Sequence, residues 1–207
     1  MNSDEATVFA GGTLVTPTRE VQADLVVQAG TIREVRPNGH ALPGEKVIDC
    51  EGLYVGPGLV DIHVHGGAGH DFVTDDPREI AQGVEYHLSQ GVTSIAPSGL
   101  SVPIDEMRRA IEATREAARD SRADILGYHI EGMYLDQTYR GGHLAEYVHN
   151  PDPDEYEPLI EEHGDFITEW TLAPELPGAL ELIRACRKAG IVTSAGHSAA
   201  TYEDTLR

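Results

Sequence analysis

Residues 56–207 alternate short apolar runs with amphipathic ones, and this alternation constrains the fold more than any other feature of the chain. The apolar runs predict five strands, Leu59–His65, Val92–Pro97, Ile125–Glu131, Phe166–Ala173 and Ile191–Ala195. Apolar residues at helical spacing predict the helices Pro77–Gln90, Pro103–Asp120, Asp152–His163 and Pro177–Ala189, with another beginning over Ser198–Leu206. Strand–helix units repeated in this way imply right-handed βαβ connections and a parallel sheet.

Five strand–helix units are fewer than the eight that close a (β/α)8 barrel. We therefore expect an α/β fold in which residues 56–207 form an incomplete (β/α) TIM barrel whose C-terminal part is missing. An open five-stranded sheet is the alternative.

Residues 1–55 contain short β-branched runs between turns and predict a small β-sandwich module, with Thr7–Val15 as its first strand. Ala29-Gly30 is expected to form a tight hairpin turn.

Two histidines stand at the end of the first barrel strand, in the sequence His63-Val64-His65. Side chains two residues apart on a strand point to the same face, with their Cα atoms roughly 6.6 Å apart. Both imidazoles can therefore converge on one metal ion. Asp61, two residues earlier, faces the same way. It is a candidate to orient one of the imidazoles from outside the ligand shell, and a core carboxylate with its hydrogen bonds satisfied is the alternative.

Two further strands end in residues that bind metals, because Glu131 ends the third strand and His197 follows the fifth. The C-terminal ends of parallel barrel strands share one face. We therefore expect His63, His65, Glu131 and His197 around a divalent metal. Imidazole and carboxylate donors fit Zn²⁺, Fe²⁺, Mn²⁺ or Co²⁺, as one or two ions that Glu131 would bridge. His129 is assigned to the core or to the shell outside the ligands, whereas surface positions are expected for His70, His87, His149 and His163.

The charge balance excludes several partners. Asp and Glu number 35 against 15 Lys and Arg, a net charge of −20, and Lys46 and Lys188 are the two lysines. Such a field repels nucleic acid and anionic membranes. No run approaches the roughly 18 apolar residues of a membrane helix, and the first residues do not resemble a signal peptide. We expect a cytoplasmic protein, and the acidic, lysine-poor composition favours a halophilic source.

The segment Pro57–Gly66 resembles the opening strand of the amidohydrolase superfamily. More specifically, the chain resembles the N-acetylglucosamine-6-phosphate deacetylases. The further segments that carry this resemblance are Gly91–Ser94, Gly127–Gly132, Gly141–Tyr147, Thr171–Glu175 and Gly196–Tyr202. The resemblance covers nearly all of residues 7–207, and the ordered set of segments is much more specific than the opening motif.

This resemblance implies a metal-dependent hydrolase that removes the N-acetyl group from N-acetylglucosamine 6-phosphate, giving glucosamine 6-phosphate and acetate. It implies that Glu131 and His197 bind metal, and that His63 and His65 form a pair that some members keep for a second metal. Gly142-His143 matches a loop that contacts substrate. In the family a catalytic aspartate, a phosphate-binding arginine and another metal-binding histidine come later, so no catalytic residue is assigned up to Arg207.

The chain departs from the family pattern in two segments near the substrate. Glu131-Gly132-Met133-Tyr134 stands where the family usually has Glu-Gly-Pro-Phe, and Gly141-Gly142-His143 stands where it has Gly-Ala-His. The sugar specificity therefore stays open. Arg140 and His143 are the local basic pair that we nominate for phosphate. Asp61 and Glu175 are candidate proton carriers, although a structural role is expected for each.

Three hypotheses remain open for the function. The first is a deacetylase half that binds an amino-sugar phosphate and works as a homo-oligomer or with a missing C-terminal half. The second is another amidohydrolase that acts on a cyclic amide or an N-acyl substrate. The third is an inactive, truncated remnant, since an incomplete barrel exposes apolar strand edges that favour association.

Overall fold

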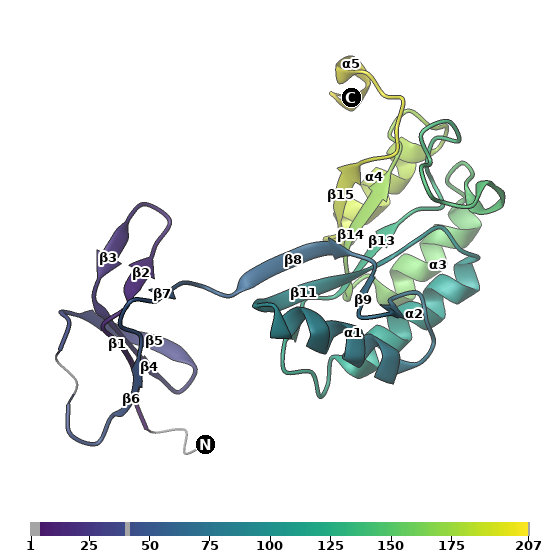
Figure 1. The fold of residues 1–207 in the computed structure, drawn as a ribbon. Coiled ribbons are helices and arrows are strands. Elements are labelled where there is room, and N and C mark those ends of the chain that lie inside the picture. The colour runs from purple at the N-terminus through teal and green to yellow at the C-terminus, as the bar shows by residue number, and fades with distance from the viewer. Residues whose placement is uncertain (1–4, 40–41, 207) are drawn as a thin grey trace. The chain divides into compact units, whose positions relative to one another are not determined.

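The computed structural model describes residues 5–39 and 42–206 and divides into two compact units, Met1–Pro57 and Gly58–Arg207. In the first unit, one sheet has the order β5-β4-β1-β6 and another has the order β3-β2-β7 (Figure 1). Their bounds are β1 Thr7–Ala10, β2 Thr13–Val15, β3 Glu20–Gln22, β4 Asp24–Gln28, β5 Thr31–Arg36, β6 Lys46–Asp49 and β7 Tyr54–Val55. Val8 and Val26 are fully buried between these strands and form the small core of this unit.

The hairpin predicted at Ala29-Gly30 is confirmed. Both residues have positive φ, 49° and 75°, as a two-residue turn between twisted antiparallel strands requires. The prediction of one strand over Thr7–Val15 is wrong, because the chain turns at Gly11, whose φ is 77°. The two halves of that segment belong to different sheets.

The second unit contains the predicted half-barrel. Five strand positions follow one another in the order β8-β11-β13-β14-β15, with β12 also paired to β11, and all of these pairs are parallel (Figure 1). Their bounds are β8 Leu59–Val64, β11 Val92–Gly99, β12 Asp124–Ile125, β13 Tyr128–Glu131, β14 Ile167–Leu172 and β15 Val192–Ala195. The strand predicted over Ile125–Glu131 is interrupted at Gly127, where a Cβ atom would stand 2.4 Å from the carbonyl oxygen of Phe166.

Helices connect these strands, as the apolar spacing predicts. They are α1 Pro77–Ser89, α2 Ile104–Ala117, α3 Pro153–His163 and α4 Ala179–Ala189, followed by the short α5 Tyr202–Thr205. Between them lie the hairpin β9 Gly66–Gly67 and β10 His70–Asp71, and the 3₁₀ turn η1 Ala145–Tyr147. Asp76 and Asp152 cap α1 and α3 by accepting from backbone N–H groups, each with a proline at the start of the helix. In the part of the chain that the structure describes, no helix is long and apolar enough to cross a membrane.

Most of the core lies between β13, β14 and the helices α2, α3 and α4. Trp170 is fully buried there and stacks on Tyr134, with ring centroids 5.6 Å apart. A second cluster, centred on Phe72, Ile80 and Ile95, fills the space under α1. This packing fixes the outer face of the sheet, and so determines where the C-terminal ends of the strands lie.

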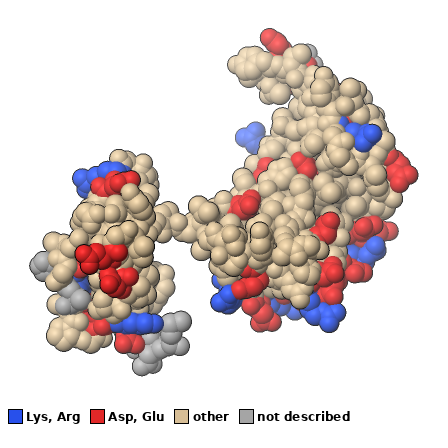
Figure 2. All heavy atoms as spheres, in the orientation of Figure 1, with Lys and Arg blue, Asp and Glu red and all other residues tan. Residues whose placement is uncertain are grey.

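Salt bridges pair some of the acidic side chains on the surface with arginines. Arg115 contacts Asp165 at 2.9 and 2.7 Å, and Arg108 contacts Asp105 and Glu162 at 2.7 Å each. Figure 2 shows acidic side chains spread over both units, several with basic ones beside them. Because 35 acidic residues stand against 15 basic ones, the surface keeps a large negative excess.

His163, expected at the surface, is instead 8% exposed at the end of α3. Its Nε2 has no hydrogen-bond partner among the described residues, with the carboxylates of Glu112 and Glu162 at 3.9 and 3.8 Å. Burial lowers the pKa of this imidazole, and the charges of Arg108 and Arg115 lower it further, against the two glutamates. The sequence pattern missed this burial because it depends on how α3 packs against α2.

The free energy of unfolding should therefore fall as the pH drops below about 6.5, the ordinary pKa of histidine. With its folded-state pKa below that value, His163 takes up its proton first in the unfolded chain. The favourable contribution is present above about pH 6.5 and is lost as the pH falls through the folded-state pKa. Urea unfolding at pH 7.5 and 5.5 should show a smaller difference for His163→Gln than for the wild type. An equal difference would contradict this role.

Candidate metal centre

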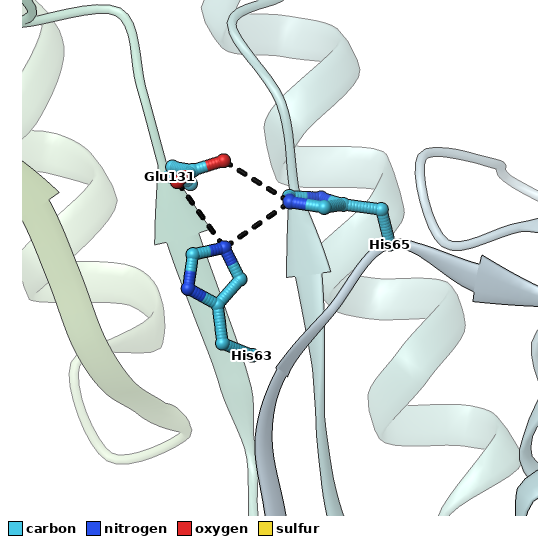
Figure 3. A group of neighbouring side chains, drawn as sticks. All are labelled: His63, His65 and Glu131. Atoms are coloured by element: carbon cyan, nitrogen blue, oxygen red, sulfur yellow. Dashed lines mark hydrogen bonds and ion pairs between the residues drawn. The ribbon is translucent and has the colours of Figure 1, made fainter. Parts of the chain in front are cut away.

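His63 and His65 converge at the C-terminal end of β8. The Nε2 atoms of the two rings are 3.2 Å apart, and both face Glu131 at the end of β13 (Figure 3). The His63 Nε2 lies 3.1 Å from Glu131 Oε1, and the His65 Nε2 lies 3.0 Å from Oε2. The period of two on a strand and the parallel order of β8, β11 and β13 explain this approach.

His197 completes the predicted group. It follows β15, and its Nε2 lies 3.1 Å from Glu131 Oε1. Its backbone is in the left-handed region, with φ at 50°, which is strained for a residue other than glycine. A hydrogen bond from the Asp136 N–H to the His197 carbonyl, at 2.9 Å, holds this turn. The structure thus brings all four predicted ligand candidates to one place.

Backbone carbonyls fix the orientation of two of these rings. The Nδ1 of His65 lies 3.2 Å from the Ser98 carbonyl oxygen, and the Nδ1 of His197 lies 2.9 Å from that of Tyr139. A carbonyl only accepts, so Nδ1 carries a proton in each ring, and in the neutral imidazole Nε2 keeps its lone pair. This is the arrangement of a metal-binding histidine. Sequence reasoning missed both carbonyls, because no side-chain pattern marks them.

His143 has the opposite arrangement. Its Nδ1 accepts from the backbone N–H of Ser101 at 3.0 Å, so the proton of the neutral ring is on Nε2. That Nε2 points at Glu131 Oε2, 3.4 Å away, and the side chain is buried. Gly132 permits this packing, since its φ is 132° and a Cβ there would stand 2.4 Å from the Ser101 hydroxyl. His143 therefore faces the cluster as a hydrogen-bond donor.

The donor set fits a divalent metal. His63, His65 and Glu131 form one group of possible ligands, and Glu131, His143 and His197 form another, with the ligand atoms of each group within 4.8 Å of one another. Two ligands about 2.05 Å from a tetrahedral Zn²⁺ lie roughly 3.3 Å apart. The nitrogen–nitrogen and nitrogen–oxygen separations of 3.0–3.2 Å in the first group are close to that spacing.

The cluster keeps Glu131 ionised. Burial acts to raise the pKa of its carboxyl group. Without a metal, hydrogen bonds from His143 and from the doubly protonated ring of His65, together with the charge of His63, hold that pKa well below its ordinary value. The same hydrogen bond to Glu131 raises the pKa of His65. A carboxylate that stays charged among several imidazoles is a favourable electrostatic environment for a cation.

Other candidates from the sequence lie differently. Asp61 accepts from the backbone N–H of His63 at 3.1 Å, so it fixes the strand end instead of an imidazole. Glu175 accepts from the Ser198 hydroxyl at 2.7 Å and from the Ala199 N–H at 2.6 Å, and so holds the loop after His197. Glu175 thus has the structural role that the sequence favoured, and Asp61 has a structural role at the backbone instead of the imidazole contact considered for it.

The two residues of the predicted substrate loop differ in burial. His143 lies inside the cluster, whereas Gly142 is exposed. A Cβ atom built on Gly142 would meet nothing within 4 Å, so the alanine usual in the deacetylases would fit there. Arg140, nominated for phosphate, donates to the carbonyls of Gly141 and His143 in its own loop.

The fold and this cluster of imidazoles around a carboxylate define the class of protein. Residues 54–207 match the sequence model of the amidohydrolase family, and the chain belongs to that family.

Within the family, the chain is similar to N-acetylglucosamine-6-phosphate deacetylases. It is 34% identical over 182 residues to the Haemophilus influenzae enzyme of that name, and the alignment covers 86% of this chain and 47% of the relative. The solved Pasteurella multocida deacetylase matches 97% of this chain and 53% of its own, with a TM-score of 0.90 and 28% identity. The Mycobacterium smegmatis D267A mutant, solved with N-acetyl-D-glucosamine-6-phosphate, matches 97% of this chain and 52% of its own, with a TM-score of 0.87 and 27% identity. The chain spans about half the length of these relatives.

Proposed function

We propose that this chain forms the metal-binding part of a hydrolase that removes the N-acetyl group from N-acetylglucosamine 6-phosphate, giving glucosamine 6-phosphate and acetate. The observation that carries the proposal is the position of Glu131, whose oxygens lie within 3.4 Å of the Nε2 atoms of four histidines. Relatives with this activity match the chain along most of its length.

His63, His65, Glu131 and His197 are the residues that would hold one or two divalent ions. A divalent ion, Zn²⁺, Fe²⁺, Mn²⁺ or Co²⁺, would lower the pKa of a bound water molecule to about 7 and polarise the amide carbonyl. The Ser98 and Tyr139 carbonyls hold His65 and His197 in the required tautomer. We leave the proton carrier to the leaving amine unassigned, because both oxygens of Glu175 already hold the loop after His197.

His143 is the proposed contact to the substrate amide, with Gly142 beside it in the same loop. The Ser101 N–H keeps the His143 Nε2 protonated, so this nitrogen can donate to the amide oxygen as negative charge develops there. The Ser101 N–H holds the ring in place, and the Nε2–H, which faces Glu131 in this structure, would turn to the amide oxygen when substrate binds. This role would not require His143 to bind the metal.

We expect His143→Asn to lower kcat for deacetylation by about 10²–10³-fold, the usual cost of removing one oxyanion donor. Metal content should stay at the wild-type value, because Nε2 of His143 has no free lone pair. Steady-state kinetics with parallel metal analysis of the purified variant would check both expectations. His149→Asn is the matched control, since His149 pairs with Glu155 outside the cluster. Loss of metal from the His143 variant would make His143 a ligand instead.

The proposed function is tested by two measurements on the chain itself. The first is Zn²⁺ or Co²⁺ content after dialysis, which should be one or two ions per chain. The second is acetate release from N-acetylglucosamine 6-phosphate, with its galactosamine epimer testing the sugar and a hydantoin testing the cyclic-amide alternative. Bound metal without acetate release would contradict the activity of this chain alone, and hydantoin opening would favour the second class of substrate.

The proposed substrate, partners and location follow the predictions made from the sequence. The substrate is a small amino-sugar phosphate, and neither nucleic acid nor a membrane is expected as a partner because the net charge is −20. Assembly as a homo-oligomer, or with a complementary C-terminal half, would cover apolar side chains such as Val60 and Ile62 of β8, which are 63% and 54% exposed. A cytoplasmic location and a halophilic source stay predictions.

A further inference from the structure

His129 is a fully buried imidazole that the proposed chemistry does not use. It lies on β13, two residues before Glu131. Its Nδ1 is 2.9 Å from the hydroxyl of Ser98 on β11, and its Nε2 is 2.9 Å from the hydroxyl of Thr171 on β14. A neutral imidazole uses one nitrogen as donor and the other as acceptor, and the two hydroxyls satisfy either tautomer. The ring therefore links three neighbouring strands below the metal cluster.

The same network reaches β8 through Ser98. The Ser98 hydroxyl accepts from the backbone N–H of Val64, the residue between the two histidine ligands, at 3.0 Å. The pairing of β8 with β11 is irregular here, because the register shifts between Ile95 and Pro97. A side-chain hydroxyl thus provides the hydrogen bond that a regular ladder would supply, at the position where β8 must be held most firmly.

Both histidines of the pair touch this network directly. The His63 ring packs edge-on against the His129 ring, with centroids 4.6 Å apart and an interplanar angle of 81°. The His65 Nδ1 is bonded to the carbonyl oxygen of Ser98. A displacement of His129 or Ser98 would therefore move one imidazole or the other away from Glu131.

We propose that His129, held by Ser98 and Thr171, is a positioning residue that keeps His63 and His65 directed at the metal. This role rests on the proposed metal centre. This role explains why buried polar side chains link β8, β11, β13 and β14, although apolar side chains would pack there more simply. In this arrangement the ligands would contact the ion, and the residues behind them would contact only the ligands.

The test compares Thr171→Val with Thr114→Val in the full chain. Each substitution replaces one buried hydroxyl with a methyl group and so keeps the shape of the side chain. Thr114 donates to the Ala110 carbonyl within α2, away from the cluster. We expect Thr171→Val to weaken Co²⁺ and Zn²⁺ binding by about 10- to 100-fold, the usual effect of losing a residue that orients a ligand. The visible spectrum of the Co²⁺ form should change as well. Thr114→Val should bind within about twofold of the wild type, and Thr171→Ser should restore binding.

Ser98→Ala is the second variant, and it should reduce metal affinity at least as much because it also frees the Val64 N–H. Circular dichroism of the metal-free variants shows whether each has folded. Wild-type affinity and an unchanged Co²⁺ spectrum in folded Thr171→Val and Ser98→Ala would overturn the positioning role while leaving the metal centre intact. Failure of the wild-type chain to bind Co²⁺ or Zn²⁺ would overturn the metal centre itself and, with it, this role.

Discussion

Replacing Glu131 with glutamine should weaken binding of Zn²⁺ or Co²⁺ by at least about a thousandfold, which corresponds to about 4 kcal/mol. The carboxylate is common to both groups of possible ligands and is the one anionic donor that they contain. A carboxamide of the same shape has no charge with which to offset a dication. Isothermal titration calorimetry, or competition with a chromophoric chelator, would measure the loss.

Glu155→Gln is the matched control for this prediction. Glu155 also faces an imidazole, with the His149 Nε2 at 3.6 Å from its Oε2, and it accepts from the Tyr134 hydroxyl at 3.1 Å. It belongs to neither group of possible ligands. We expect metal affinity to be unchanged in this variant. Equal affinity in Glu131→Gln and the wild type would remove Glu131 from the metal centre.

Replacing Trp170 with alanine should lower the free energy of unfolding by about 3–5 kcal/mol, the range for truncating a fully buried aromatic residue. Trp170 is completely buried, stacks on Tyr134 and donates from Nε1 to the Gly132 carbonyl at 3.3 Å. Gly132 directly follows Glu131. The cavity would therefore loosen the end of β13 as well as the core.

Urea unfolding followed by circular dichroism would test this prediction, because Trp170 is the only tryptophan of the chain and its fluorescence is lost in the variant. Tyr202→Ala is the control, since Tyr202 is 72% exposed and such surface changes usually stay within about 0.5 kcal/mol. Trp170→Phe keeps an aromatic ring and should fall between the two. A loss below about 1 kcal/mol in Trp170→Ala would show that the site relaxes to fill the space.

Much of the fold can be predicted from the sequence, because apolar runs and the helical spacing of apolar residues are local properties. Short apolar runs predicted β8 and β14, and apolar residues at a spacing near 3.6 predicted α1 and α2, each to within three residues. The breaks at Gly11 and Gly127 were missed for a different reason. Each depends on backbone geometry that only the neighbouring segments impose.

The spacing of residues along the chain was enough to predict which side chains meet at the candidate metal centre. His63 and His65 share a strand face, and parallel strands bring their C-terminal ends, with Glu131 and His197, to the same edge. What each imidazole can do there depends on packing between distant segments. The Ser98 carbonyl leaves the Nε2 of His65 free to bind a metal, whereas the Ser101 N–H makes His143 a donor. These tautomers depend on backbone groups brought close by packing, and the spacing of side chains along a sequence does not encode where those groups lie.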